Sequence, residues 1–386
     1  MAGMSFEDYV NAYYKGGLDI SKRYGIKKDD LTTGDTAYFN TMYGASVFNQ
    51  LNTESDVFKL FRKEGWTQSG WRVLTARSAA ASNIGVAEGA AFGTSDVPDL
   101  AEVYATIKEI VSPWTVSTRA SILAEADDGV KGLATFLRAQ AAEAHSYYID
   151  KYLCEDYADV ATVDAGDVNF TPLTRICANH AQVAARSGTV AAELDVYNLT
   201  ARGDGATWAD GYVEGAGGTN RVLSLDILDT TIKNAIENGA NYDNLIFLMG
   251  HTQLSELKQL LTAGTSNATW RMTMDAQAPK GTNGVTSQPG MNLDGRVGYY
   301  DSIPIYATQH LADTMTDQSG GTGMGPMLLL DMEHLYMKIA APTTFLAQED
   351  LANVQALKRN YAFMTAGELI CTKFASQGLI TDLKLA

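Results

Sequence analysis

The sequence predicts an α+β protein built from one long helix, an extended β-hairpin and a strand-rich C-terminal part. The helix is predicted for residues 127–155, where Leu133 and Leu137 belong to a run of apolar residues at three- and four-residue steps. The hairpin is predicted for residues 66–112, and long strand-like runs follow residue 326. Because such a helix is some 40 Å long at about 1.5 Å per residue, the final strands must return to pack along it.

Length and composition limit the class of protein. The 386 residues suffice for two or three domains, and 46% of them are apolar, far from the composition of a disordered chain. Acidic residues exceed basic ones by 45 − 29 = 16. This excess argues against a surface that coats nucleic acid, although a negative wall could still enclose nucleic acid without gripping it.

Cysteine usage and hydropathy indicate where the chain is made. The three cysteines, Cys154, Cys177 and Cys371, are widely spaced and odd in number, so we expect no disulfide framework and synthesis inside a cell. Residues 1–30 lack the basic start and apolar core of a signal peptide, and no stretch of about 18 apolar residues occurs. We therefore expect neither classical export nor insertion into a membrane.

Residues 1–65 combine many aromatic residues and glycines with poor periodicity. Such a segment has little core of its own but is too apolar to stay solvated. Two interpretations remain open: an extended arm that docks on another surface, including that of a neighbouring subunit, or an irregular cap on the same subunit.

The hairpin is predicted from two partly alternating segments, residues 71–77 and 102–108. Pro113 is expected to end its ladder, because proline cannot donate a ladder hydrogen bond. Between the strands lie residues 78–100, which are small and punctuated by glycine. Loops longer than about 12–15 residues are uncommon in compact domains and usually functional. With few large apolar groups, this tip should reach out from its own domain and be ordered by a partner.

The middle of the chain predicts a layered subdomain of helices and strands. Gly239 is expected to end one of its helices. The predicted elements are helices at 170–186, 221–240 and 252–264, a turn-rich stretch at 203–220, a buried strand at 244–250, a strand-turn-strand unit at 298–311, and strands at 327–340 and 343–375.

A search for chemistry gives no convincing site. No histidine lies in a His-Glu-x-x-His pattern, and no cysteine pair has zinc-like spacing. Asp164, Asp167 and Asn169 fit a solvated turn better than a calcium loop. Glu333 and His334 lie in a strand-like run, where neighbours point to opposite faces. We therefore expect no catalytic residue, no cofactor and no metal.

Several segments, in their order, resemble the Hong Kong 97-type major capsid proteins of tailed double-stranded DNA viruses. The resemblance covers roughly residues 55–386. The segments that carry it are VSTRASILAEADDGVKGLATFLRAQAAEAHSYYIDKYL at 116–153, NLIFLMGHTQLSELKQLL at 244–261, GYYDSIPIYATQHL at 298–311, GPMLLLDMEHLYMKI at 325–339 and LKRNYAFMTAGELICTKFA at 357–375.

The resemblance implies a domain plan. It makes 1–65 an N-arm, 66–112 an extended E-loop hairpin, 113–160 and 326–386 a peripheral domain with a spine helix near 127–155, and 161–325 an axial domain. The implied function is self-assembly through hexamers and pentamers into an icosahedral viral head around double-stranded DNA.

The implied partners are other copies of the chain, a portal, and a separate scaffold or decoration protein. DNA would be enclosed without sequence-specific binding, and no membrane is implied. The protein would be made in the host cytoplasm and would end up in the virion.

Two features depart from some members of that family. Only about 65 residues precede the hairpin, which favours a separate scaffold, or none, over a removed N-terminal one. The tip at 78–100 contains no lysine, so the lysine–asparagine crosslinks of some members are not expected there.

Interface residues are expected on the hairpin. Small residues would let its tip approach a partner closely, and tryptophans near its base would anchor it or belong to the subunit's own core. The candidates are Trp66, Trp71, Ala80, Ala90, Phe92 and Trp114. Two other functions stay open: the shell of an encapsulin-like cellular nanocompartment, and a soluble α+β enzyme with a lid hairpin.

Overall fold

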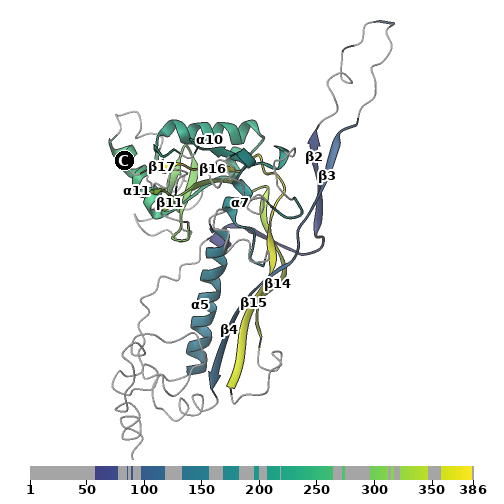
Figure 1. The fold of residues 1–386 in the computed structure, drawn as a ribbon, viewed down its shortest axis with the longest axis vertical. Helices are drawn as coiled ribbons and strands as arrows, with labels where there is room; N and C mark the ends of the chain where they lie inside the picture. The colour runs from purple at the N-terminus through teal and green to yellow at the C-terminus, as the bar shows by residue number, and fades with distance from the viewer. Residues whose placement is uncertain are drawn as a thin grey trace, which may run out of the picture. The chain divides into compact units, whose positions relative to one another are not determined.

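The structure is a computed structural model, shown in Figure 1. It contains two compact units: one of residues 1–53, 111–145 and 344–364, the other of residues 54–110, 146–343 and 365–386. The residues that the structure describes are 57–76, 85, 88–89, 97–117, 133–155, 168–181, 195–199, 207–217, 219–263, 272–273, 296–311, 314–316, 322–346 and 358–384.

A mixed seven-stranded sheet forms the centre of the second unit. Its order is β5-β16-β13-β7-β10-β9-β8. The strands are β5 (Tyr212–Glu214), β16 (Gly378–Ile380), β13 (Met327–Asp331), β7 (Leu245–Met249), β10 (Ile303–Ala307), β9 (Arg296–Tyr300) and β8 (Met272–Thr273). Every residue of β7 and β13 is buried, as expected for a central strand that is covered on both faces. The predicted buried strand at 244–250 is confirmed.

Two helices pack on this sheet (Figure 1). Both α10 (Leu225–Glu237) and α11 (His251–Ala263) contribute buried residues to one core cluster with Phe247. After α10, the Gly239 amide donates to Ile236 and the Ala240 amide to Ala235, and Gly239 has φ +83°. This is a Schellman C-cap, so the predicted helix end at Gly239 is confirmed.

The strand-turn-strand unit at 298–311 is also confirmed. Strands β9 and β10 pair antiparallel, with Ile303 opposite Tyr300. The connecting residues Asp301 and Ser302 both have positive φ, 47° and 69°. Two successive left-handed residues are the signature of the type I′ turn, whose twist suits a tight hairpin.

A second, four-stranded sheet has the order β11-β12-β17-β6. Its strands are β11 (Thr314–Thr316), β12 (Thr322–Met324), β17 (Leu383–Lys384) and β6 (Arg221–Val222). Strand β17 follows β16 of the seven-stranded sheet, and Leu379, Ile380 and Leu383 are fully buried. The last described residues therefore connect the cores of two sheets.

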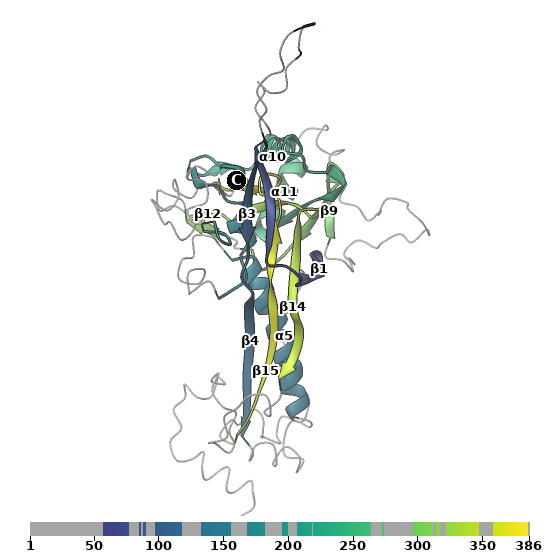
Figure 2. The same cartoon turned by 90° about the vertical axis from the view of Figure 1, so that its right-hand side faces the viewer.

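Four long elements have residues in both units: β4 (Lys108–Ser117), α5 (Leu133–Leu153), β14 (Leu335–Leu346) and β15 (Lys358–Cys371). Figure 2 shows β4, β14 and β15 as long strands of one sheet, whose order is β1-β14-β15-β4, with β1 at Arg62–Gly65. A short helix, α3 (Val57–Leu60), precedes β1.

The long helix and the final strands pack together, as predicted. In the first unit the Arg138 guanidinium lies 4.1 Å from the centre of the Phe345 ring. In the second unit Leu153 shares a core cluster with Leu335 and Leu369. Helix α5 is described from Leu133, and the predicted start at 127–132 lies outside the described residues.

Three local predictions are wrong. Pro113 does not end a ladder but lies inside β4, an edge strand, where proline is tolerated. Residues 170–186 do not form one helix, because α7 (Leu173–Cys177) ends at an extended Ala178. Glu333 and His334 lie in a turn between β13 and β14 and not in a strand.

Candidate assembly surface

The predicted hairpin is present as a ribbon of two strands, β2 (Gly70–Ala76) and β3 (Asp99–Tyr104). They pair antiparallel, with Trp71 opposite Val103 and Leu74 opposite Leu100. No third strand pairs with them among the described residues (Figures 1 and 2). Side chains alternate between the two faces of such a ribbon, so its two faces can meet different surroundings.

The outward face of the hairpin carries three large, exposed apolar side chains and one ion pair. It carries Leu74, Leu100 and Tyr104, whose exposed fractions are 54%, 63% and 55%. Between them Arg72 and Glu102 lie opposite each other, with 3.7 Å between Nε and Oε1. A soluble subunit rarely exposes several large apolar side chains side by side unless another surface covers them.

Exposed apolar groups are concentrated in and around this hairpin. Nine large apolar residues of the described part are exposed. Six of them fall between residues 74 and 111: Leu74, Val97, Leu100, Tyr104, Ile107 and Val111. A site for another protein is therefore better supported here than elsewhere in the described part.

The inward face of the hairpin packs on its own subunit. Val103 is buried, and the Trp71 ring meets the Tyr197 ring edge to face, with 5.2 Å between centroids. At the base, the Ala105 amide donates to the Ser69 carbonyl over 2.9 Å. The two faces thus differ: residues of the same subunit cover the inward face, whereas the apolar side chains of the outward face stay exposed.

A buried ion pair lies where the chain leaves the hairpin and enters β4. Lys108 Nζ is 2.9 Å from Glu368 Oε2, and both side chains are buried. The amides of Thr171 and Leu369 each donate to Glu368 Oε1 over 2.9 Å. Burial raises the pKa of the Glu368 carboxyl, and the nearby Lys108 ammonium opposes that rise.

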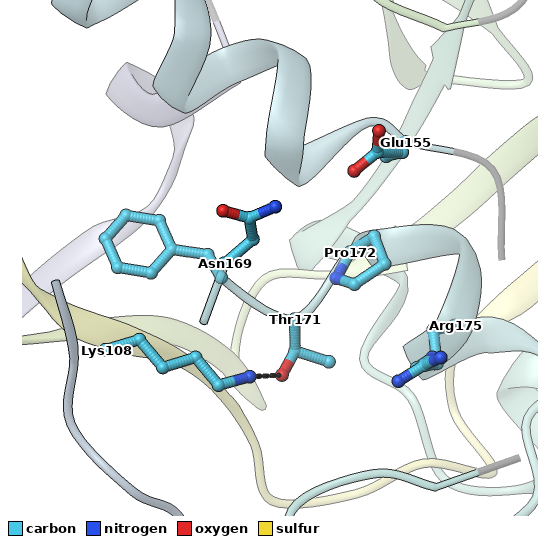
Figure 3. A pocket seen from close by; sticks show the side chains of 7 residues that line it. Lys108, Glu155, Asn169, Thr171, Pro172 and Arg175 are labelled. Atoms are coloured by element: carbon cyan, nitrogen blue, oxygen red, sulfur yellow. Dashed lines mark hydrogen bonds between the residues drawn. The ribbon is translucent and has the colours of Figure 1, made fainter. Parts of the chain in front are cut away.

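Figure 3 shows the small pocket beside this pair, where Lys108 Nζ also donates to Thr171 Oγ1 over 3.1 Å. Glu155, Asn169 and Arg175 line the same space. Its volume of about 10 Å³ matches one water molecule. A pocket of this size does not admit an organic substrate. We therefore interpret the charged residues around it as structural.

The predicted interface residues fall into two sets. The Trp66 amide donates to the Ile339 carbonyl over 2.9 Å. The Trp114 ring stacks on the Tyr361 ring at 4.4 Å. These contacts, and that of Trp71 with Tyr197, are within the subunit, and the role of the tryptophans as anchors for another copy stays a prediction. Ala80, Ala90 and Phe92 lie outside the described residues.

Metal-ligating side chains do not gather in the part of the chain that the structure describes. No group of three His, Cys, Asp or Glu residues there could hold a metal ion. No described helix is long and apolar enough to cross a membrane. Cys154, Cys177 and Cys371 are all buried, free cysteines.

Four residues of this region were missed by the sequence-based prediction. Lys108 and Glu368 form the buried pair, and Tyr197 and Asn198 contact the hairpin base. Lys108 was predicted only as part of the alternating segment 102–108, and no pattern around Tyr197 or Asn198 singled them out. Only the packing of segments distant in the sequence brings these residues together.

Comparisons with known proteins show the fold. No protein-family model matches the chain, and no curated protein matches it. A chain of the capsid asymmetric unit of cyanophage A-1(L) is 14% identical, with a TM-score of 0.57 over 91% of this chain and 98% of that one. A chain from the capsid of a native GTA particle is 12% identical, with a TM-score of 0.54 over 87% and 92%.

A chain from Mycobacterium phage Bobi is 11% identical, with a TM-score of 0.50 over 92% of this chain and 99% of that one. At identities of 11–14%, the structural likeness establishes the fold of this chain and nothing beyond it. The chain has an α+β, Hong Kong 97-type capsid fold, as the order of its segments predicted.

Proposed function

We propose that this chain is a major capsid protein that assembles through hexamers and pentamers into the icosahedral head of a tailed virus. The observation that carries the proposal is the fold shared with the cyanophage A-1(L) capsid over 91% of this chain and 98% of that one. A match over nearly the whole of both chains supports a shared role better than a match of one subdomain would.

The hairpin supplies the physical reason for assembly. An isolated two-stranded ribbon is marginally stable in water, and here three large apolar side chains on one face stay exposed. We propose that this outward face docks on a second copy. Full burial of one large apolar side chain contributes about 1.5–3 kcal/mol. Leu74, Leu100 and Tyr104 are already about half buried, so together they contribute a few kcal/mol per contact, repeated around the shell.

The proposed domain plan follows the family resemblance. Residues 1–65 serve as the N-arm and 66–112 as the E-loop. Residues 113–160 and 326–386 form the peripheral domain, and 161–325 form the axial domain. Two observations on the described elements support this plan: α5 and the long strand β15 share a core cluster, and five strands of the seven-stranded sheet lie within 212–307. The other two strands of that sheet, β13 and β16, come from residues 326–386.

The negative net charge of the chain supports a shell that encloses DNA without binding it tightly. A net charge of −16 opposes close binding of phosphates. The proposed partners are further copies, a portal, and a separate scaffold or decoration protein, and the proposed location is the virion after synthesis in the host cytoplasm. The tip at 78–100 lacks lysine, so we expect the protein to run as a monomer on denaturing gels of purified particles.

The direct test is negative-stain electron microscopy of the full chain expressed alone. We expect polyhedral shells, or rings of five and six subunits. If only particles of one to four subunits form, with and without co-expressed scaffold, the proposal fails and an enzyme with a lid hairpin gains ground. Nuclease-resistant double-stranded DNA inside native particles supports a virus, whereas a protein cargo supports a nanocompartment.

A further inference from the structure

A tight turn of the second unit holds the base of the hairpin. Val196 and Leu199 exchange both backbone hydrogen bonds, at 3.1 and 2.9 Å, so Tyr197 and Asn198 occupy the two central positions of a turn. Tyr197 has φ +58°, which is unusual for a residue other than glycine. Such a conformation persists where the surroundings hold it in place, and it often marks a functional position.

Asn198 binds the free edge of β3. Its Oδ1 accepts from the Tyr104 amide at 2.8 Å, and its Nδ2 donates to the Glu102 carbonyl at 3.3 Å. In an antiparallel ribbon, alternate residues direct their backbone groups away from the partner strand. The amide side chain therefore takes the place of a third strand at the base of the hairpin.

Tyr197 connects the other strand to the core. Its ring contacts Trp71 of β2, while its hydroxyl donates to the Leu369 carbonyl at 2.6 Å and accepts from the Cys371 amide at 2.8 Å. Leu369 and Cys371 are fully buried residues of β15. Tyr197 and Asn198, adjacent in one turn, thus contact both strands of the hairpin. Tyr197 is also hydrogen-bonded to the core strand β15.

We infer that the Tyr197–Asn198 turn is a clamp that sets the direction in which the hairpin leaves the subunit, and thereby the curvature at which copies join. The inference rests on the proposed function, since curvature has a meaning only in a shell. Contacts of this kind make a two-stranded ribbon resist bending at its base. A change of direction at one contact is repeated in every copy, so a small change alters the size at which the shell closes.

Three variants separate the parts of the clamp. Asn198→Ala removes both bonds to β3, and Asn198→Asp keeps an acceptor for the Tyr104 amide while losing the donor to the Glu102 carbonyl. Tyr197→Phe keeps the ring on Trp71 but removes the hydroxyl that binds β15. Asn234→Ala is the matched control, because Asn234 bonds the Thr230 carbonyl within α10.

The test combines hydrogen exchange of the unassembled full-length chain with the diameter distribution of assembled particles. For Asn198→Ala we expect exchange at 71–74 and 100–104 to be about 10-fold faster while β7 and β13 keep their protection. We also expect broadened or shifted particle diameters. Asn198→Asp and Tyr197→Phe should change both readouts less, and Asn234→Ala should change neither.

The outcomes separate this inference from the proposed function. If the wild-type chain forms shells and Asn198→Ala forms shells of the same narrow diameter, the clamp is contradicted, even if hairpin exchange accelerates. A uniform loss of protection across the subunit also contradicts it, because that result reports a general structural role. If the wild-type chain never forms shells, the proposed function fails, and so does the part of the inference that concerns curvature.

Discussion

The centre of the seven-stranded sheet and the hairpin are both apolar β-structure, but only the first is complete within one subunit. In β7 every residue is buried, whereas in β2 none is. Phe247 of β7 packs against Tyr300, while Leu74 and Leu100 lie opposite each other in water. An apolar strand therefore shows that a surface must be covered, and the tertiary structure shows whether the same chain covers it.

Phe247→Ala should give the largest effect on subunit stability. Phe247 is 1% exposed, so truncation leaves a cavity and should lower the unfolding free energy by about 3–5 kcal/mol. Urea denaturation of the unassembled subunit measures the change. A loss below about 1 kcal/mol would mean that this sheet is not the stable part of the molecule.

Lys108→Met should lower the unfolding free energy nearly as much as Phe247→Ala. It leaves the Glu368 carboxylate buried without its cation, for which about 3 kcal/mol is expected at neutral pH. Burial raises the folded-state pKa of Glu368, so the carboxyl takes up a proton on acidification. The deficit relative to wild type should therefore shrink as the pH falls toward the ordinary value of 4.5.

The matched control is Arg72→Met, which breaks the exposed pair with Glu102 on the hairpin. An exposed pair contributes at most about 0.5–1 kcal/mol, so the unfolding free energy should hardly change. Equal losses for the buried and the exposed pair would contradict the distinction drawn between the two regions.

Leu74→Ser with Leu100→Ser should change the unassembled subunit little and assembly strongly. Both side chains are more than half exposed, so the unfolding free energy should fall by less than about 1 kcal/mol. If a second copy covers them, the protein concentration needed for assembly should rise at least about 10-fold, which corresponds to 1.4 kcal/mol. Light scattering against concentration measures it, and an unchanged threshold would show that the outward face stays in water.

The smallest expected effect is a pH dependence at His145. Burial lowers the pKa of this imidazole below 6.5, and its Nδ1 lies 2.8 Å from Ser112 Oγ. A lowered pKa means that the unfolded chain binds the proton more tightly. The stability that neutral His145 contributes is present above pH 6.5 and is lost as the pH falls through the folded-state pKa.

His145→Gln should therefore flatten the fall in unfolding free energy between about pH 6.5 and pH 5. Denaturant titrations of both proteins across that interval test it. Parallel curves for wild type and variant would show that another group causes the acid sensitivity.

Local sequence patterns correctly predicted the elements that depend on interactions between residues close in the sequence. The apolar run of β7, the helix end at Gly239 and the strand-turn-strand unit around Pro304 are all confirmed. Each depends on side-chain periodicity or on a backbone preference that neighbouring residues fix. The segment order was also enough to identify the fold.

The predictions that were wrong concern segments whose structure depends on tertiary contacts. Pro113 lies within a strand because β4 is at the edge of its sheet. The helix expected at 170–186 stops because Ala178 is extended and its carbonyl accepts from the Gly211 amide at 3.0 Å. Gly211 approaches so closely that a Cβ there would lie 2.2 Å from the Cys177 carbonyl oxygen. The contacts of Tyr197 and Asn198 likewise join distant segments and leave no local pattern.

The central claim is that a second copy covers the outward face of the hairpin. Hydrogen exchange of the full-length chain before and after assembly tests it most directly. We predict that protection at residues 97–107 rises on assembly, while β7 and β13 are protected equally in both states. Equal exchange of the hairpin in subunits and in closed shells would contradict the claim.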